Sequence, residues 1–149
     1  MTTTVIVRDA RPDDAEALAP VLATLGYPTD PGAIRERFAA LLRTDPTARI
    51  LVGEVDGRVL GVATLHVTPV LHRPSSVGRV TALAVVPSAQ GTGLGRRLIE
   101  AAERHFVSLG LARIELTSDT IHHPAFGFYR HLGYEDHGVR FAKVLTLGG

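Results

Sequence analysis

The feature that most constrains this chain is a buried strand that runs through a glycine-rich turn into an amphipathic helix. Residues Val80–Val86 are almost continuously apolar, as in a strand covered on both faces, and Pro87 ends the run. The turn Gln90–Arg96 follows, and from Leu94 to Leu109 the apolar side chains recur along one helical stripe. A sheet with helices on its faces, an α/β fold, is therefore the expectation.

The glycine-rich turn has the composition of an anion-binding site. Glycines let backbone N–H groups converge on an anion, the helix N-terminus adds about half a positive charge, and Arg96 and Arg97 add mobile charge. A phosphate or pyrophosphate is the expected ligand. A P-loop is disfavoured because no Lys follows the glycines, and the Rossmann pattern fails because its sixth position, counted from Gly91, is Arg96. The alternative is a tight strand-to-helix connection in which the glycines serve only the turn.

The rest of the chain predicts one mixed α/β domain over residues 1–149. The expected strands are Val5–Val7, Arg49–Val55, Arg58–Val67, Val80–Val86, Arg113–Thr117 and one or two strands between Val139 and Leu147. The expected helices are Asp13–Leu25, a second that starts at Asp30-Pro31-Gly32 and ends at Asp45-Pro46, Leu94–Leu109 and Pro124–Leu132. Asp56-Gly57, between two apolar runs, predicts a hairpin with a type I′ turn.

Composition argues against several other kinds of site. The formal net charge is only +1 and no basic run occurs, so nucleic acid is not an expected partner. The absence of cysteine excludes disulfides, thiolate metal sites and a Cys nucleophile, and it agrees with a reducing compartment. No signal peptide precedes Val5, and no apolar run approaches the roughly 20 residues that cross a bilayer. We therefore expect a soluble, cytoplasmic protein with no membrane partner.

Three segments resemble the GNAT family of N-acetyltransferases, in the order in which the family has them. Val85-Val86-Pro87 and the following Gln90–Gly95 resemble the family's strand end and its Gln-x-x-Gly-x-Gly loop, which holds the pyrophosphate of acetyl-CoA. Val7–Ala15 is similar to the opening strand and helix, and Phe128–Tyr134 to the segment Phe-Tyr-x-x-Leu-Gly-Phe/Tyr. The resemblance implies the GNAT fold, a mixed central β-sheet of six to seven strands flanked by about four helices.

The resemblance also implies the co-substrate, acetyl-CoA, and the residues that surround it. The expected contacts are Leu83, Ala84, Val85, Gln90, Gly91, Thr92, Gly93, Leu94, Gly95, Arg96 and Phe128. The backbone of Leu83–Val85 is expected to pair with the pantetheine amides in the manner of strand addition, with the Val85 amide as oxyanion donor. Tyr129 is the expected catalytic acid that protonates the leaving thiolate; the alternative is a packed aromatic residue of an amphipathic helix.

The general base is left open by the sequence. Many relatives carry Glu in the strand before the loop, where this chain has Gly78–Ala82 and no carboxylate. A water wire is one option, and histidine is the natural base near neutral pH. The side-chain candidates are Glu54, Glu115, Asp119, His66, His72, His122 and His123. No metal is expected, because two adjacent histidines, His122 and His123, seldom share one ion and no other ligand spacing is evident.

The expected reaction moves an acetyl group to a primary amine of a small molecule by direct attack in a ternary complex. The C-terminal third, from Glu115 to Lys143, is similar to aminoalkylphosphonate acetyltransferases, but Arg79 and Ala82 stand where those enzymes carry acidic residues. Gly26–Asp30 is expected to form part of the acceptor wall. The alternatives are a protein or peptide N-acetyltransferase and a non-catalytic acyl-CoA-binding module. A homodimer is expected by family analogy alone.

Overall fold

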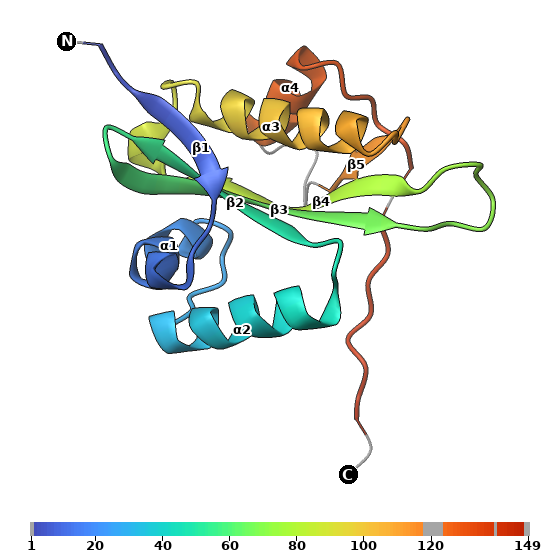
Figure 1. Cartoon of the computed structure of the whole chain (residues 1–149), viewed down its shortest axis with the longest axis horizontal. Helices are drawn as coiled ribbons and strands as arrows, with labels where there is room; N and C mark the ends of the chain where they lie inside the picture. Colours follow the sequence, from blue (N-terminus) through green and yellow to red (C-terminus); the bar gives the residue numbers. More distant parts are fainter. Residues whose placement is uncertain (1, 118–123, 139, 148–149) are drawn as a thin grey trace. The chain divides into compact units, whose positions relative to one another are not determined.

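The computed structural model describes residues 2–117, 124–138 and 140–147 (Figure 1). The chain forms two compact units, Met1–Leu116 and Thr117–Gly149. The first unit contains a sheet and three α-helices, and the second contains α4 (Pro124–His131). The expectation of one domain over residues 1–149 stays a prediction.

The first unit is built on a five-stranded sheet. In sheet order its strands are β1 (Val5–Asp9), β2 (Arg49–Val55), β3 (Arg58–Thr68), β4 (Val77–Val85) and β5 (Ile114–Leu116). The first four run antiparallel to their neighbours, and β5 runs parallel to β4, so the sheet is mixed. Asp56 and Gly57 connect β2 to β3 with φ of 51° and 83°. Positive φ at both residues is what the predicted type I′ turn requires.

Helices cover both faces of this sheet. The helices α1 (Ala15–Ala23) and α2 (Pro31–Thr44) lie on one face, and α3 (Leu94–Ser108) lies on the other (Figure 1). Each face has its own core, and alternate residues of the strands point into one or the other. The α1–α2 core includes Leu18, Val21, Ile34, Val52, Val62 and Ala84. The α3 core includes Leu51, Leu65, Val80, Leu94, Leu98 and Phe106.

The predicted α/β class, the mixed sheet and the four helices are confirmed among the described residues, but the strand count is lower. Six to seven strands were expected, and the described part of the chain contains five. Residues 140–147 contain no strand, and Val139 lies outside the described residues. Phe141 and Val144 are 91% and 95% exposed, so the apolar pattern of this segment has no packing surface within the described chain. A strand needs a partner ladder as well as a pattern.

Three strand glycines let α3 lie close against the sheet. A Cβ atom on Gly53 would overlap the Leu94 side chain, and one on Gly78 would lie 2.6 Å from the Phe106 ring, so at both positions a larger residue would force α3 side chains to shift. A Cβ atom on Gly61 would lie 3.0 Å from Leu94 Cδ2, a tight contact that a small adjustment of Leu94 could relieve. The first residue of α3, Leu94, is 1% exposed and fills the room that two of them leave.

The start of the chain is fixed by a partly buried ion-pair cluster. Arg8 on β1 donates to both carboxylate oxygens of Asp14 at 2.9 Å and to Glu54 on β2 at 2.6 Å. Asp14 also accepts from the backbone N–H of Arg11 at 2.7 Å, and its side chain is only 8% exposed. The Arg8 guanidinium holds the pKa of the Asp14 carboxyl below its ordinary value. The cluster joins β1, β2 and the 3-10 turn Pro12–Asp14 that leads into α1.

Replacing Asp14 by asparagine is expected to lower the free energy of unfolding by roughly 2 kcal/mol at pH 7, because the partly buried Arg8 guanidinium loses its charged hydrogen bonds to Asp14. Since the folded-state pKa of Asp14 is depressed, its contribution is complete above the unfolded-state pKa of about 3.9 and declines as the pH falls through the folded-state pKa. The difference between the native chain and the variant should therefore shrink at pH 3. Urea unfolding at pH 7 and pH 3 measures it.

The matched control is Asp13→Asn. The Asp13 side chain is 82% exposed and lies 3.6 Å from Arg11. An exposed pair of this kind contributes under about 1 kcal/mol, so the control should unfold nearly like the native chain. Equal losses in both variants would show that the buried cluster stabilises the fold no more than a surface pair does.

Candidate functional site

In the described chain, several backbone N–H groups of the glycine-rich turn and of the helix that follows it donate no hydrogen bond. A 3-10 turn, Pro87–Ala89, follows β4, and the chain then passes through Gly91 and Gly93, with φ of 85° and 86°, into α3. L-residues rarely adopt this conformation, so glycine is required at both positions. Within the described residues, no hydrogen bond uses the backbone N–H of Gly91, Gly93, Gly95 or Arg96. Free donors at a helix N-terminus form an anion site.

Buried packing fixes the position of this turn. Thr92 Oγ1 donates to the Ala89 carbonyl and accepts from the Leu94 N–H at 3.3 Å, which closes the turn on itself. The Leu94 side chain packs onto the sheet over Gly53 and Gly61. The next residue of the helix, Gly95, is half-buried. The donors are therefore placed by the core rather than by a mobile loop.

The predicted charges lie beside the turn. Arg96 is 61% exposed and pairs with Glu100 at 3.3 Å, one helical turn along α3. An exposed pair of this kind is weak, so the guanidinium can exchange its carboxylate for a phosphate at little cost. Arg97 is exposed and makes no ion pair among the described residues. Gln90 is exposed at the outer end of the turn.

The strand before the turn presents an open backbone edge. β4 pairs with β3 along its length, including Leu83–Val85. On its other side, β5 pairs only with Gly78, Arg79 and Val80. Among the described residues no strand covers the outer edge of Leu83–Val85, so the N–H and C=O groups that alternate residues point away from β3 are open to an extended ligand. Leu83, Ala84, Val85 and the turn Gln90–Arg96 thus lie together in one compact unit.

Two further predicted residues, Phe128 and Tyr129, lie on α4 in the second unit. Their ring centroids are 5.5 Å apart, and Tyr134 lies 6.3 Å from Tyr129 edge-on. The Tyr134 N–H donates to the Tyr129 carbonyl at 3.0 Å. Burial raises the pKa of the Tyr129 hydroxyl, which keeps its proton at neutral pH. A protonated phenol is the form that a proton donor needs. Its predicted role at the thioester stays a prediction.

The candidates for the general base differ in their surroundings. Glu54 is bound by Arg8 at 2.6 Å, and Glu115 by Arg113 at 2.7 Å, with Arg79 at 3.5 Å. The Arg113 guanidinium lowers the pKa of Glu115, which makes it a weak base. His72 is exposed in the β3–β4 loop. Asp119, His122 and His123 lie outside the described residues.

His66 differs from these because two side chains hold its ring. Its Nδ1 lies 2.7 Å from Asp45 Oδ2, and its Nε2 lies 2.9 Å from Thr81 Oγ1. Sequence reasoning named His66 as one of several candidates, placed Asp45 only at a helix end, and gave Thr81 no role. The available signal was limited to a histidine on a predicted strand and an aspartate at a predicted helix end, 21 residues apart in the sequence. The contact between His66 and Thr81 depends on the β3–β4 register, which the sequence does not reveal.

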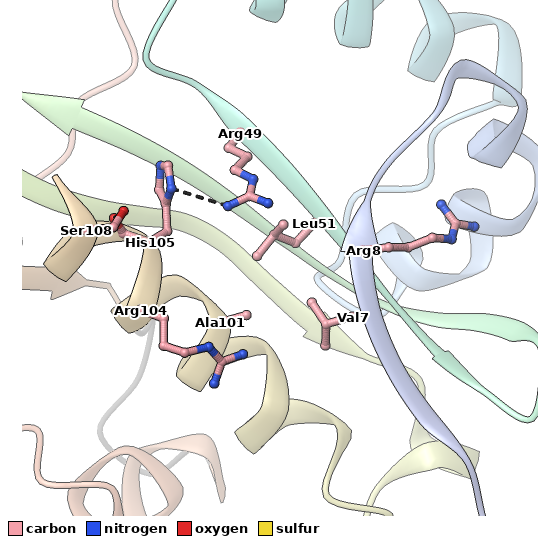
Figure 2. Close-up of a pocket in the computed structure, with 8 residues that line it drawn as sticks. All are labelled: Val7, Arg8, Arg49, Leu51, Ala101, Arg104, His105 and Ser108. Atoms are coloured by element: carbon pink, nitrogen blue, oxygen red, sulfur yellow. Dashed lines mark hydrogen bonds between the residues drawn. The ribbon is translucent and has the colours of Figure 1, made fainter.

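A pocket lies on the other face of the sheet, between β1, β2 and α3 (Figure 2). It encloses about 340 Å³ and is lined by Val7, Arg8, Arg49, Leu51, Ala101, Arg104, His105 and Ser108. Arg49 pairs with Asp9 at 2.7 Å and lies 3.3 Å from His105 Nδ1. Burial and the Arg49 charge lower the pKa of His105. None of these residues was predicted to belong to the site, and they flank the C-terminal half of α3 rather than its N-terminus.

The described residues contain no group of three or more His, Cys, Asp or Glu side chains arranged to hold a metal ion. No described helix is long and apolar enough to span a bilayer.

Comparisons with known proteins agree on one family. Residues 15–134 match the family model described as acetyltransferase (GNAT) family. The chain is 30% identical over 140 residues to the aminoalkylphosphonate N-acetyltransferase of Salmonella typhimurium, covering 93% of this chain and 90% of that protein. It is 37% identical over 90 residues to the mycothiol acetyltransferase of Pseudarthrobacter chlorophenolicus, covering 60% of this chain but only 28% of that protein.

The fold has solved counterparts. The crystal structure of glucosamine-6-phosphate N-acetyltransferase from Arabidopsis thaliana superposes with a TM-score of 0.80 at 19% identity. The match covers 96% of this chain and 99% of that one. At this level of identity the match supports a shared fold alone.

Proposed function

This chain belongs to the acetyltransferase (GNAT) family, and from that membership we propose that it transfers the acetyl group of acetyl-CoA to a primary amine of a small molecule. The observation that carries the proposal is the set of unbonded N–H groups at the start of α3, next to the open edge of β4. A pyrophosphate at the helix end and an extended pantetheine along Leu83–Val85 would satisfy both.

The proposed reaction is direct attack in a ternary complex. The amine nitrogen attacks the thioester carbonyl, and the carbonyl oxygen takes up negative charge, which a backbone N–H of β4 stabilises; Val85 is the proposed donor. As the C–S bond breaks, the Tyr129 hydroxyl gives its proton to the leaving thiolate. The raised pKa of Tyr129 supports this assignment, because the group is protonated when the thiolate leaves. Phe128 would lie against the co-substrate.

The acceptor is proposed to be a small amine. The relative that spans nearly the whole chain is named for an aminoalkylphosphonate substrate. In this chain, however, Arg79 is paired with Glu115 at 3.5 Å, and Ala82 offers no carboxylate. The proposed acceptor is therefore a small amine, and we do not propose that it carries a phosphonate group. Gly26–Asp30, between α1 and α2, exposes 66% of the Tyr27 side chain and is the proposed acceptor wall.

Thiol release tests the proposal. The chain lacks cysteine, so a thiol reagent reports only the CoA set free from acetyl-CoA. We expect release that depends on one class of a panel of small amines, aminophosphonates, aminoglycosides and short peptides. Release with peptides alone would favour the protein N-acetyltransferase alternative. Tight acetyl-CoA binding without release would favour a binding module, and absence of binding would contradict the proposal.

Initial-rate patterns separate the two orders of reaction. Direct attack in a ternary complex gives intersecting double-reciprocal lines when acetyl-CoA and the amine are varied together, whereas an acyl-enzyme gives parallel lines. Intersecting lines are the expected result. The predicted homodimer and cytoplasmic location do not enter this test and stay predictions.

A further inference from the structure

Asp45, His66 and Thr81 form a continuous chain of side-chain hydrogen bonds on the α2 face of the sheet. Asp45 ends α2, His66 lies on β3 and Thr81 lies on β4. Asp45 Oδ2 and Thr81 Oγ1 lie 2.7 Å and 2.9 Å from the two ring nitrogens of His66. In this order the imidazole can take a proton through the hydroxyl, and the carboxylate orients the ring and stabilises the imidazolium.

A β-bulge places Thr81 at the open end of this chain. Thr64 pairs with Ala82 and Leu65 pairs with Val80, which leaves Thr81 as an extra residue on β4. Bulges re-aim a side chain and recur beside active sites. Thr81 is exposed, whereas the His66 side chain behind it is only 18% exposed. A substrate would therefore meet the hydroxyl first and the imidazole through it.

The carboxylate fixes the direction of the hydrogen bonds. Asp45 also accepts from the N–H and the hydroxyl of Thr47, at 2.9 Å and 2.6 Å. The hydrogen bonds with His66 and Thr47 lower the pKa of Asp45 to about 2, so it is ionised at neutral pH. An ionised carboxylate only accepts, so Nδ1 of His66 carries a proton and Nε2 of the neutral ring accepts from Thr81. The Thr81 oxygen keeps its lone pairs for an N–H group of the substrate.

We propose that Thr81 and His66 are the proton acceptor for the attacking amine, with Asp45 as the residue that positions the ring. This assignment rests on the proposed acetyl transfer. As the N–C bond forms, the amine proton passes through bridging water to Thr81 Oγ1 while the Thr81 proton moves to His66 Nε2. The imidazolium that results is stabilised by Asp45 and later releases its proton to water. The C–S bond breaks and the thiolate receives a separate proton from Tyr129.

The place of Thr81 on β4 agrees with this role. It lies two residues before Leu83 and four residues before Val85, the proposed oxyanion donor, which is about 7 Å and 13 Å along a strand. Bridging water molecules would connect an amine that attacks there with the Thr81 hydroxyl. Two charged groups face His66. One is Asp45, and the other is Arg79, the cross-strand partner of His66, which is itself paired with Glu115. β4 itself carries no carboxylate that would compete for the proton.

The test compares His66→Gln and Thr81→Val with the native chain, using kcat/KM across pH with the amine found by thiol release. We expect roughly a 100-fold loss for each at pH 7, and the loss of the rising acid limb in His66→Gln, since general base catalysis contributes a factor of about 10² to 10⁴. Thr81→Ser keeps the hydroxyl and should restore the native rate within about twofold. Asp45→Asn should move the acid limb without removing it.

His105→Gln is the matched control, because His105 is also held by neighbours but lies on the α3 face. It should keep the native pH profile. Native activity in His66→Gln and Thr81→Val would overturn the relay while leaving acetyl transfer intact. A native chain that binds acetyl-CoA but turns over no amine would instead overturn the proposed function. Imidazole ¹⁵N shifts add a readout without turnover: a proton on Nε2 in place of Nδ1 would contradict the relay, whatever the activity.

Discussion

Replacing Gly95 by aspartate is expected to weaken acetyl-CoA binding about 100-fold without destabilising the fold. Gly95 is the second residue of α3, and its N–H is one of the unbonded donors. A carboxylate there would face the pyrophosphate at about 5 Å, which costs roughly 3 kcal/mol at an effective dielectric of 20. The same charge favours the positive end of the helix by about 0.3–1 kcal/mol. Affinity and stability should therefore move in opposite directions.

Calorimetric titration with CoA and thermal unfolding measure the two effects on the same sample. Gly95→Asn is the matched control, because it adds nearly the same volume without the charge. We expect the Asp variant to regain part of its affinity at high salt, since the repulsion is screened, and the Asn variant to respond to salt like the native chain. Native affinity in Gly95→Asp would show that the anion binds elsewhere and would contradict the proposed site.

Replacing Tyr129 by phenylalanine is expected to lower kcat about 100-fold while leaving acetyl-CoA affinity within about twofold. General acid catalysis contributes a factor of about 10² to 10⁴. The ring that packs against Phe128 and Tyr134 is retained, so the aromatic contacts survive and only the hydroxyl is lost. Single-turnover thiol release at saturating acetyl-CoA isolates the chemical step.

Tyr134→Phe provides the comparison within the same segment. It removes a hydroxyl from a neighbouring ring and leaves that of Tyr129 in place, so kcat should stay close to native. A mere packing role for Tyr129 predicts no rate loss in either variant. The pH dependence adds a second criterion, because the loss of a proton donor with a raised pKa should remove the decline of kcat at high pH.

The sequence predicted the parts of the fold that depend on local chemistry. Gly110 was expected to end α3, and it has a φ of 77° directly after the last turn of that helix. Asp30 was expected to start α2, and its side chain accepts from the Ala33 N–H at 3.0 Å. The loop from Gln90 to Arg96 was found for the same reason. Turn residues, helix ends and glycines with positive φ act on their immediate neighbours, so one segment contains the whole signal.

What the sequence did not predict depends on distant partners. β4 begins at Val77 rather than Val80, because Val77, Gly78 and Arg79 pair with β3, and the last two also pair with β5. The bulge at Thr81 needs the register with β3, so the contact of Thr81 with His66 could not be anticipated. The expected strand near the C-terminus failed in the described residues 140–147 for a related reason. An alternating pattern specifies a face but not a partner.

The position of Leu94 against Gly53 and Gly61 links the proposed co-substrate loop to two strands, β2 and β3, that do not belong to it. These two glycines contribute room rather than contact, and the shape of the loop depends on the room they leave. A side chain added at Gly53 would therefore act on the loop from a distance, because it would displace Leu94 at the start of α3.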